Sequence, residues 1–138
     1  STGDARKDQK IAKAIIEKVA AELQRYCHTL DQSIPNARRE FSYALRCMEH
    51  AVIISHQDGM SNQEEAENLV SELEALRSTL SSVHEQTSGF RDEISRLPRM
   101  TSKLNQAKRR TVSSIDDFLK FLSEASVSID VTSASIMQ

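Results

Sequence analysis

The chain has 138 residues and a formal net charge of −2, and this composition excludes several classes of protein at once. Three glycines, two prolines and 4% aromatic residues exclude a β-sandwich, a barrel or an α/β sheet, because those folds need frequent turns and β-branched runs. The charge predicts no nucleic-acid partner, and no run of 18 apolar residues predicts insertion of this segment into a membrane. We therefore expect one domain of long amphipathic helices over residues 1–138.

The first predicted helix covers residues 4–30. Its apolar stripe consists of Ile11, Ile15, Val19, Leu23, Tyr26 and Leu30, widened by Ala12, Ile16, Ala20 and Cys27. Proline is tolerated in the first turn of a helix and not in its interior, so Pro35 predicts that the chain breaks and starts a new helix there. Ser33 is the expected N-cap of that second helix.

The second predicted helix covers residues 34–57 and ends at Asp58-Gly59, where the glycine can adopt the left-handed conformation that ends helices. Its buried stripe is expected to be Ala37, Phe41, Ala44, Leu45, Met48, Ala51 and Val52. Ser61 and Glu64 form a capping box, which predicts that a third helix begins at about residue 62.

The third predicted helix, residues 62–97, carries an unbroken heptad pattern. Its apolar seam advances in steps of three and four through Ala66, Leu69, Leu73, Leu76, Leu80, Val83, Thr87, Phe90, Ile94 and Leu97. Gly89 lies within it without changing the register. Pro98 ends this helix or kinks it.

The fourth predicted helix covers residues 99–131 and is followed by a frayed tail, residues 132–138. Its stripe is expected to be Leu104, Thr111, Ile115, Phe118, Leu122, Ala125 and Ile129. Four helices of similar length with short connections favour an all-α fold, an antiparallel up-down-up-down four-helix bundle with coiled-coil-like heptad packing and both termini at one end. The competing layout is a rod in which one kinked helix runs from Asn62 to Val131 and dimerises along the seam.

No catalytic or cofactor-binding motif is found, so we expect no enzyme, no cofactor and no metal. Cys47 and His50 could face the same way, but two ligands do not make a zinc site. With a turn at Ser33, Cys27 and Cys47 differ in height by about 12 Å, too far for a disulfide. Free thiols favour the cytoplasm, whereas a receptor fragment would lie outside it.

Charge is segregated along the chain. Between Arg91 and Arg110 there are seven basic residues and two acidic ones, Asp92 and Glu93, which gives a net charge of +5. A turn at Ser33 would bring further arginines to the same end of the bundle. We call the resulting set the basic pole; its members are Arg91, Arg96, Arg99, Lys103, Lys108, Arg109, Arg110, Arg38 and Arg39. The alternative is that it is solvated surface that balances an acidic remainder.

The function that these patterns favour is that of a non-enzymatic protein–protein interaction or assembly module, with the basic pole as its contact surface. Its expected partner is a helical or acidic protein, or a second copy in a homodimer. The alternative is an extracytoplasmic four-helix-bundle sensory domain of a transmembrane signalling receptor that binds a small anionic ligand. Nucleic acid is disfavoured because no aromatic residues are interleaved with the basic ones.

Overall fold

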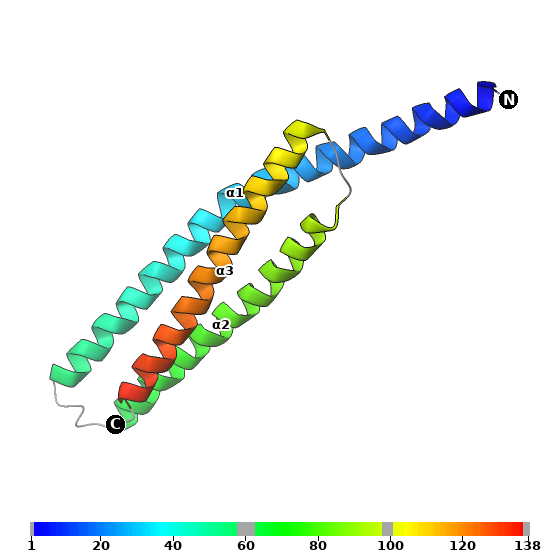
Figure 1. The fold of residues 1–138 in the computed structure, drawn as a ribbon. Helices are drawn as coiled ribbons and strands as arrows, with labels where there is room; N and C mark the ends of the chain where they lie inside the picture. Colours follow the sequence, from blue (N-terminus) through cyan, green and yellow to red (C-terminus); the bar gives the residue numbers. More distant parts are fainter. Residues whose placement is uncertain (1, 58–62, 98–100, 137–138) are drawn as a thin grey trace.

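The computed structural model describes residues 2–57, 63–97 and 101–136, and within these ranges the chain forms three α-helices. Helix α1 spans Thr2–Gln57, α2 spans Gln63–Ser95 and α3 spans Ser102–Ile136 (Figure 1). The all-α class is confirmed. The predicted four-helix bundle is wrong, because the first two predicted helices are one continuous helix.

Pro35 lies inside α1. It has no N–H to bond to the carbonyl of Asp31, a loss that disfavours proline in a helix interior. The apolar spacing nevertheless continues across it without a change of register, and Ile34, Ala37 and Phe41 all pack against the hydrophobic core. Packing of an amphipathic face supplies most helical stability in proteins, and here it maintains the helix through the proline.

The three helices run side by side, with α2 antiparallel to both α1 and α3 (Figure 1). The first turn of α1 and the last turn of α3 therefore lie at opposite ends of the molecule, and the prediction that both termini share one end is wrong. The competing rod is also wrong, since α2 and α3 lie antiparallel and form two ion pairs with each other. Pro98 itself lies outside the described residues.

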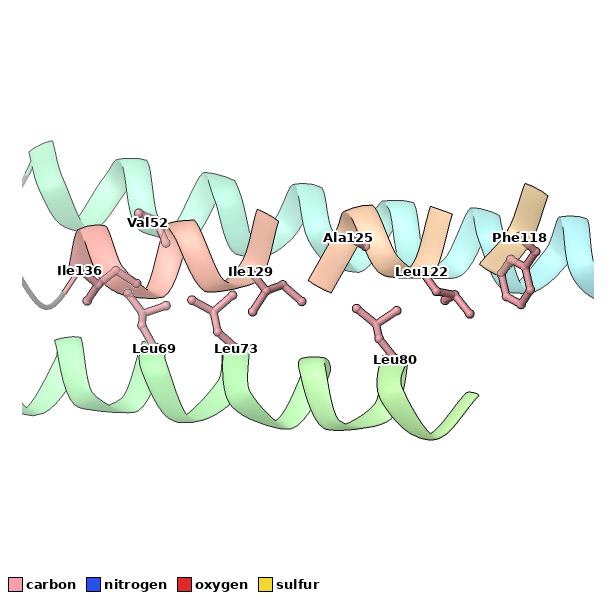
Figure 2. Packing of buried hydrophobic residues seen from close by; sticks show 9 residues of the cluster. All are labelled: Val52, Leu69, Leu73, Leu80, Phe118, Leu122, Ala125, Ile129 and Ile136. Carbon is pink, nitrogen blue, oxygen red and sulfur yellow. The ribbon is translucent and has the colours of Figure 1, made fainter. Parts of the chain in front are cut away.

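The core lies mainly between α2 and α3. Figure 2 shows three leucines of α2 pointing toward α3, with a valine of α1 close by. The buried cluster consists of Val52, Leu69, Leu73, Leu80, Phe118, Leu122, Ala125, Ile129 and Ile136. Residues 132–136 of the tail that was predicted to fray form the last turn of α3, where Ile136 is buried. Residues 137–138 lie outside the described residues.

The heptad seam of α2 is buried more fully on one of its two rows than on the other. The row that repeats every seventh residue through Leu73, Leu80, Thr87 and Ile94 is buried. The alternate row is buried at Leu69, partly buried along its middle, and 41% exposed at Phe90. Helix α2 contacts α3 far more extensively than it contacts α1. The alternate row therefore lacks the cover that a fourth helix would supply.

The start of α3 is set by Thr101, whose hydroxyl accepts a hydrogen bond from the backbone N–H of Leu104 at 3.4 Å. A threonine in this position satisfies one of the free N–H groups of the first helical turn. The helix thus begins at Ser102, close to the predicted residue 99. The predicted cap Ser61 and the Asp58-Gly59 stop lie outside the described residues.

Candidate interaction surface

The first third of α1 projects beyond the other two helices (Figure 1). Because α1 has 56 residues whereas α2 and α3 have 33 and 35, it cannot be covered along its whole length. Every side chain from residue 3 to residue 19 is exposed, and the first buried one is Leu23. We call residues 2–19 the N-terminal extension.

The extension carries an uncovered isoleucine stripe, made up of Ile11, Ile15, Ile16 and Val19. These four side chains are 52%, 58%, 59% and 36% exposed, respectively. The sequence placed them in the packed stripe of a bundle helix, and the structure corrects this. A group of large apolar side chains on one exposed face is typical of an interaction site, whereas single exposed ones are ordinary.

The stripe leads directly into a groove between α1 and α2. This apolar groove has a volume of about 460 Å³ and is lined by Val19, Glu22, Leu23, Tyr26, Phe90, Glu93, Ile94 and Leu97. The rings of Tyr26 and Phe90 meet edge to face, with centroids 5.7 Å apart, in its wall. Burial raises the pKa of the Tyr26 phenol, and the charges of Glu93 and Cys27 raise it further.

Val19 belongs to both the stripe and the groove, and this joins the two into one surface. Ile11, Ile15, Val19 and Tyr26 follow one another at steps of four, four and seven residues, which places them on one face of α1. An apolar surface therefore runs continuously from the extension into the end of the bundle.

A second groove of similar volume, about 460 Å³, separates α1 from α3 at the same end of the molecule. Its lining side chains carry both signs of charge, with Lys103 and Arg110 from α3 and Glu17 and Asp31 from α1. The carboxylates compensate the cations. We call this the polar groove. Because its charge is mixed, it should bind an anion more weakly than the site that was expected at the basic pole.

Two members of the basic pole are engaged in contacts that join α2 to α3. Arg91 donates from Nε and Nη2 to the two carboxylate oxygens of Asp116, at 2.6 and 3.3 Å. Lys108 Nζ donates to the carbonyl oxygens of Ser95 and Leu97, at 3.3 and 3.0 Å. A cation at this position satisfies carbonyls at the end of α2 and complements the helix dipole there.

The other members at this end of the molecule are not concentrated in one site. Lys103 and Arg110 line the polar groove, and Arg96 and Arg109 are exposed. Arg99 lies outside the described residues. Antiparallel packing of α2 and α3 thus brings these side chains to the same end, but over several faces.

Arg38 and Arg39 do not join them. Their expected place depended on a turn that α1 does not make. The hydroxyl of Thr111 contacts the carboxylate of Asp31 at 3.4 Å, so both arginines lie about 10 Å further along the helix axis. Arg38 lies over the ring of Phe121, 4.9 Å from its centroid, and Arg39 is exposed.

The described residues contain no group of metal ligands and no cysteine pair. Among them, no three His, Cys, Asp or Glu side chains are grouped closely enough to hold a metal ion. Cys27 is buried and Cys47 exposed, and both thiols are free, since the two residues stand about 30 Å apart on one helix. In this part of the chain, no helix has the length and apolar character needed to cross a membrane.

Comparison of the chain with protein-family models, with curated proteins and with solved structures found no match. The surface is therefore interpreted from its own geometry.

Sequence reasoning recognised the apolar residues of this surface but not their exposure. The spacing of Ile11, Ile15 and Val19 predicts a helix face that can pack. The same spacing occurs in covered and in uncovered helices, so it does not predict whether the face is buried. The available signal was the unbroken spacing of Leu30, Ile34, Ala37 and Phe41 across the proline. A helix continuous through that point must be much longer than its neighbours.

Proposed function

We propose that this protein is a non-enzymatic interaction and assembly module, which binds a helical partner on the surface formed by the isoleucine stripe and the apolar groove. The observation that carries this proposal is the continuity of exposed apolar side chains from Ile11 to the groove wall at Tyr26 and Phe90. A helix laid along this face would cover the stripe together with Phe90, at the end of the α2 seam that lines the groove.

The extension has few interactions of its own to stabilise it. Most helical stability in proteins comes from packing of an apolar face, and the apolar face of the extension is exposed. Covering its apolar face would both stabilise the helix and remove that face from water.

The basic pole contributes less to this proposal than the sequence suggested. Arg91 and Lys108 hold α2 against α3. The cations that remain exposed at this end of the described chain are Arg96, Lys103, Arg109 and Arg110. Exposed charges of this kind mainly raise the rate at which an acidic partner associates and improve discrimination between partners. They add little to the binding affinity.

The alternative, a sensory domain that binds a small anion, has weaker support. Its geometric basis was that both termini lie at one end of a four-helix bundle, and the three helices do not provide that arrangement. Its candidate ligand site is the polar groove, where the carboxylates of Glu17 and Asp31 would repel a bound anion. Apolar runs of about 20 residues flanking this segment would restore support for it.

Site-specific photocrosslinking in the cells that produce the protein tests the proposal. A benzophenone side chain at position 15, on the stripe, should give covalent adducts with a partner. The matched control is position 13, which lies on the opposite face of the same helical turn. Adducts at position 15 and not at position 13 are expected, and no adduct at position 15 would contradict the proposal.

A further inference from the structure

We infer that the partner of this surface is a second copy of the same chain, in a two-fold symmetric dimer in which each N-terminal extension lies antiparallel across the apolar groove of the other copy. This inference rests on the proposed function, because it names the partner of the same surface.

The surface is complementary to itself because the stripe and the groove lie on one helix, at one end of the bundle. A two-fold axis perpendicular to α1, at a level between Ile15 and Val19, places Ile15 of each copy beside Val19 of the other. It places Ile11 at the level of Leu23, in the groove. In this pairing the stripe of each copy covers the groove of the other. No part of the surface stays free for a third copy, so assembly stops at a dimer.

The charges of the two parts are opposite in sign. Residues 3–19 of the extension contain five basic and three acidic side chains, which gives +2. The described residues that line the apolar groove include Glu22 and Glu93 and no basic side chain. A basic helix that lies in this groove contacts carboxylates. Their attraction offsets the repulsion between the two basic extensions of the dimer.

The same register brings specific charges together. Because the rings of Tyr26 and Phe90 are in contact, Glu93 stands about one turn closer to the extension, at the level of Leu23. This is the level that Ile11 of the other copy reaches, and Lys7 and Lys10 lie within about one helical turn of Ile11.

Sedimentation equilibrium of the purified chain is the first test. We expect a species of twice the chain mass of 15.5 kDa that forms reversibly with concentration. Replacing Ile11→Glu and Ile15→Glu together should weaken the dimer about 100-fold or more, since each residue occurs twice in a symmetric interface and each 1.4 kcal/mol corresponds to tenfold. The melting temperature of the dilute monomer should not change.

The matched control is Ile53→Glu with Ile54→Glu, at the far end of the same helix. Those side chains are 54% and 44% exposed, much like the stripe, and the dimer does not use them. The control should keep the parent dissociation constant. A dimer weakened by the control and not by the stripe variant would overturn the inference, as would a chain that stays monomeric up to millimolar concentration.

Charge reversal tests the pairing of extension and groove. Lys7→Glu with Lys10→Glu should weaken the dimer, and so should Glu22→Lys with Glu93→Lys. A chain that carries all four substitutions restores opposite charges across the symmetric interface and should dimerise more tightly than either double variant. Failure of this rescue would overturn the antiparallel register.

Distance measurement separates the proposed dimer from a side-by-side one. In the antiparallel arrangement the two exposed Cys47 thiols lie at opposite ends of the assembly, about 90 Å apart at 1.5 Å per residue. Spin labels on Cys47, in a Cys27→Ser chain, should give no distance below about 60 Å. A short distance would overturn the inference.

The photocrosslinking result keeps the two proposals distinguishable. Adducts of position 15 with the chain itself support the second copy. Adducts with a different protein, from a chain that is monomeric when pure, would overturn the second copy and leave the interaction module supported. The absence of any adduct would contradict both.

Discussion

The two ends of α1 carry the same kind of apolar spacing and have different surroundings. In residues 20–57 the stripe packs against α2 and α3, whereas in residues 3–19 it is in solvent. The difference arises because two helices of 33 and 35 residues cannot cover a helix of 56. Periodicity identifies a face that can pack, whereas the length of the neighbouring helices decides whether that face is covered.

Truncation of one side chain in each of the two segments of α1 tests this difference directly. Leu23→Ala, in the covered segment, should lower the free energy of unfolding by about 2–5 kcal/mol, because Leu23 is buried next to Phe90 and Ile94 of α2 and its truncation leaves a cavity there. Ile15→Ala, two turns away in the extension, should cost less than about 0.5 kcal/mol in dilute protein. Urea denaturation measures both. Equal costs would mean that the extension is packed, and the comparison would fail.

A second, smaller effect tests whether α1 is one helix at all. Pro35→Ala restores a backbone N–H and removes the clash of the ring with the preceding turn, so it should stabilise the protein by up to about 3 kcal/mol. Thermal or urea unfolding provides the measurement. At a genuine turn the same substitution would be neutral or destabilising.

Ser33→Ala is the control for the same point. In a continuous helix, alanine at an exposed position should be neutral or slightly stabilising. If Ser33 caps a second helix, the substitution should instead cost about 1 kcal/mol.

A third effect concerns the contact between α1 and α3 at Asp31 and Thr111. The buried Thr111 hydroxyl donates to the Asp31 carboxylate, so Thr111→Val should cost about 1 kcal/mol. A double-mutant cycle with Asp31→Ala should show that the two residues are coupled. Independent effects of the two substitutions would mean that the contact does not tie α1 to α3.

The smallest effect is a pH dependence at Tyr26, where the extension meets the bundle. Because burial raises the pKa of this phenol in the folded state, folding favours its neutral form. Its contribution to stability is therefore complete below the unfolded pKa of about 10 and is lost as the pH rises through the folded pKa.

Melting temperatures between pH 8 and pH 11 check this expectation. The parent should lose more stability than Tyr26→Phe over this interval. Absorbance titration of a Tyr43→Phe chain follows Tyr26 alone, since the chain has two tyrosines. Identical pH profiles for the parent and Tyr26→Phe would contradict the assigned shift.

The sequence was sufficient for the helices and their seams but not for the connection between the first two. Local rules for proline predicted a turn before Pro35, and packing of Ile34, Ala37 and Phe41 overrides them. In α3 the stripe included Thr111 as a small polar core residue, and its burial confirms this. Propensity is local, whereas the core that decides between the two outcomes is formed by residues distant in sequence.

The candidate surface was less predictable than the fold. The clustering of charge between Arg91 and Arg110 is visible in the sequence, but which cations are used by the fold is not. Asp116 and the end of α2 engage Arg91 and Lys108 only once the helices pack. Exposure of Ile11 and Ile15 likewise depends on where α2 and α3 end.

The two ion pairs between α2 and α3 have a consequence for alignment of the helices. Arg77–Asp130 and Arg91–Asp116 are separated by fourteen residues on each helix, two full heptads, and both pair Nε with a carboxylate oxygen at 2.6 Å. A seam that repeats every seven residues would fit almost as well after sliding by one repeat. In one direction that slide would bring Arg91 opposite Arg109, and in the other it would leave Arg91 opposite Ser123. Both arginine–aspartate pairs form in only one of the registers that the heptad seam allows, so they select that register.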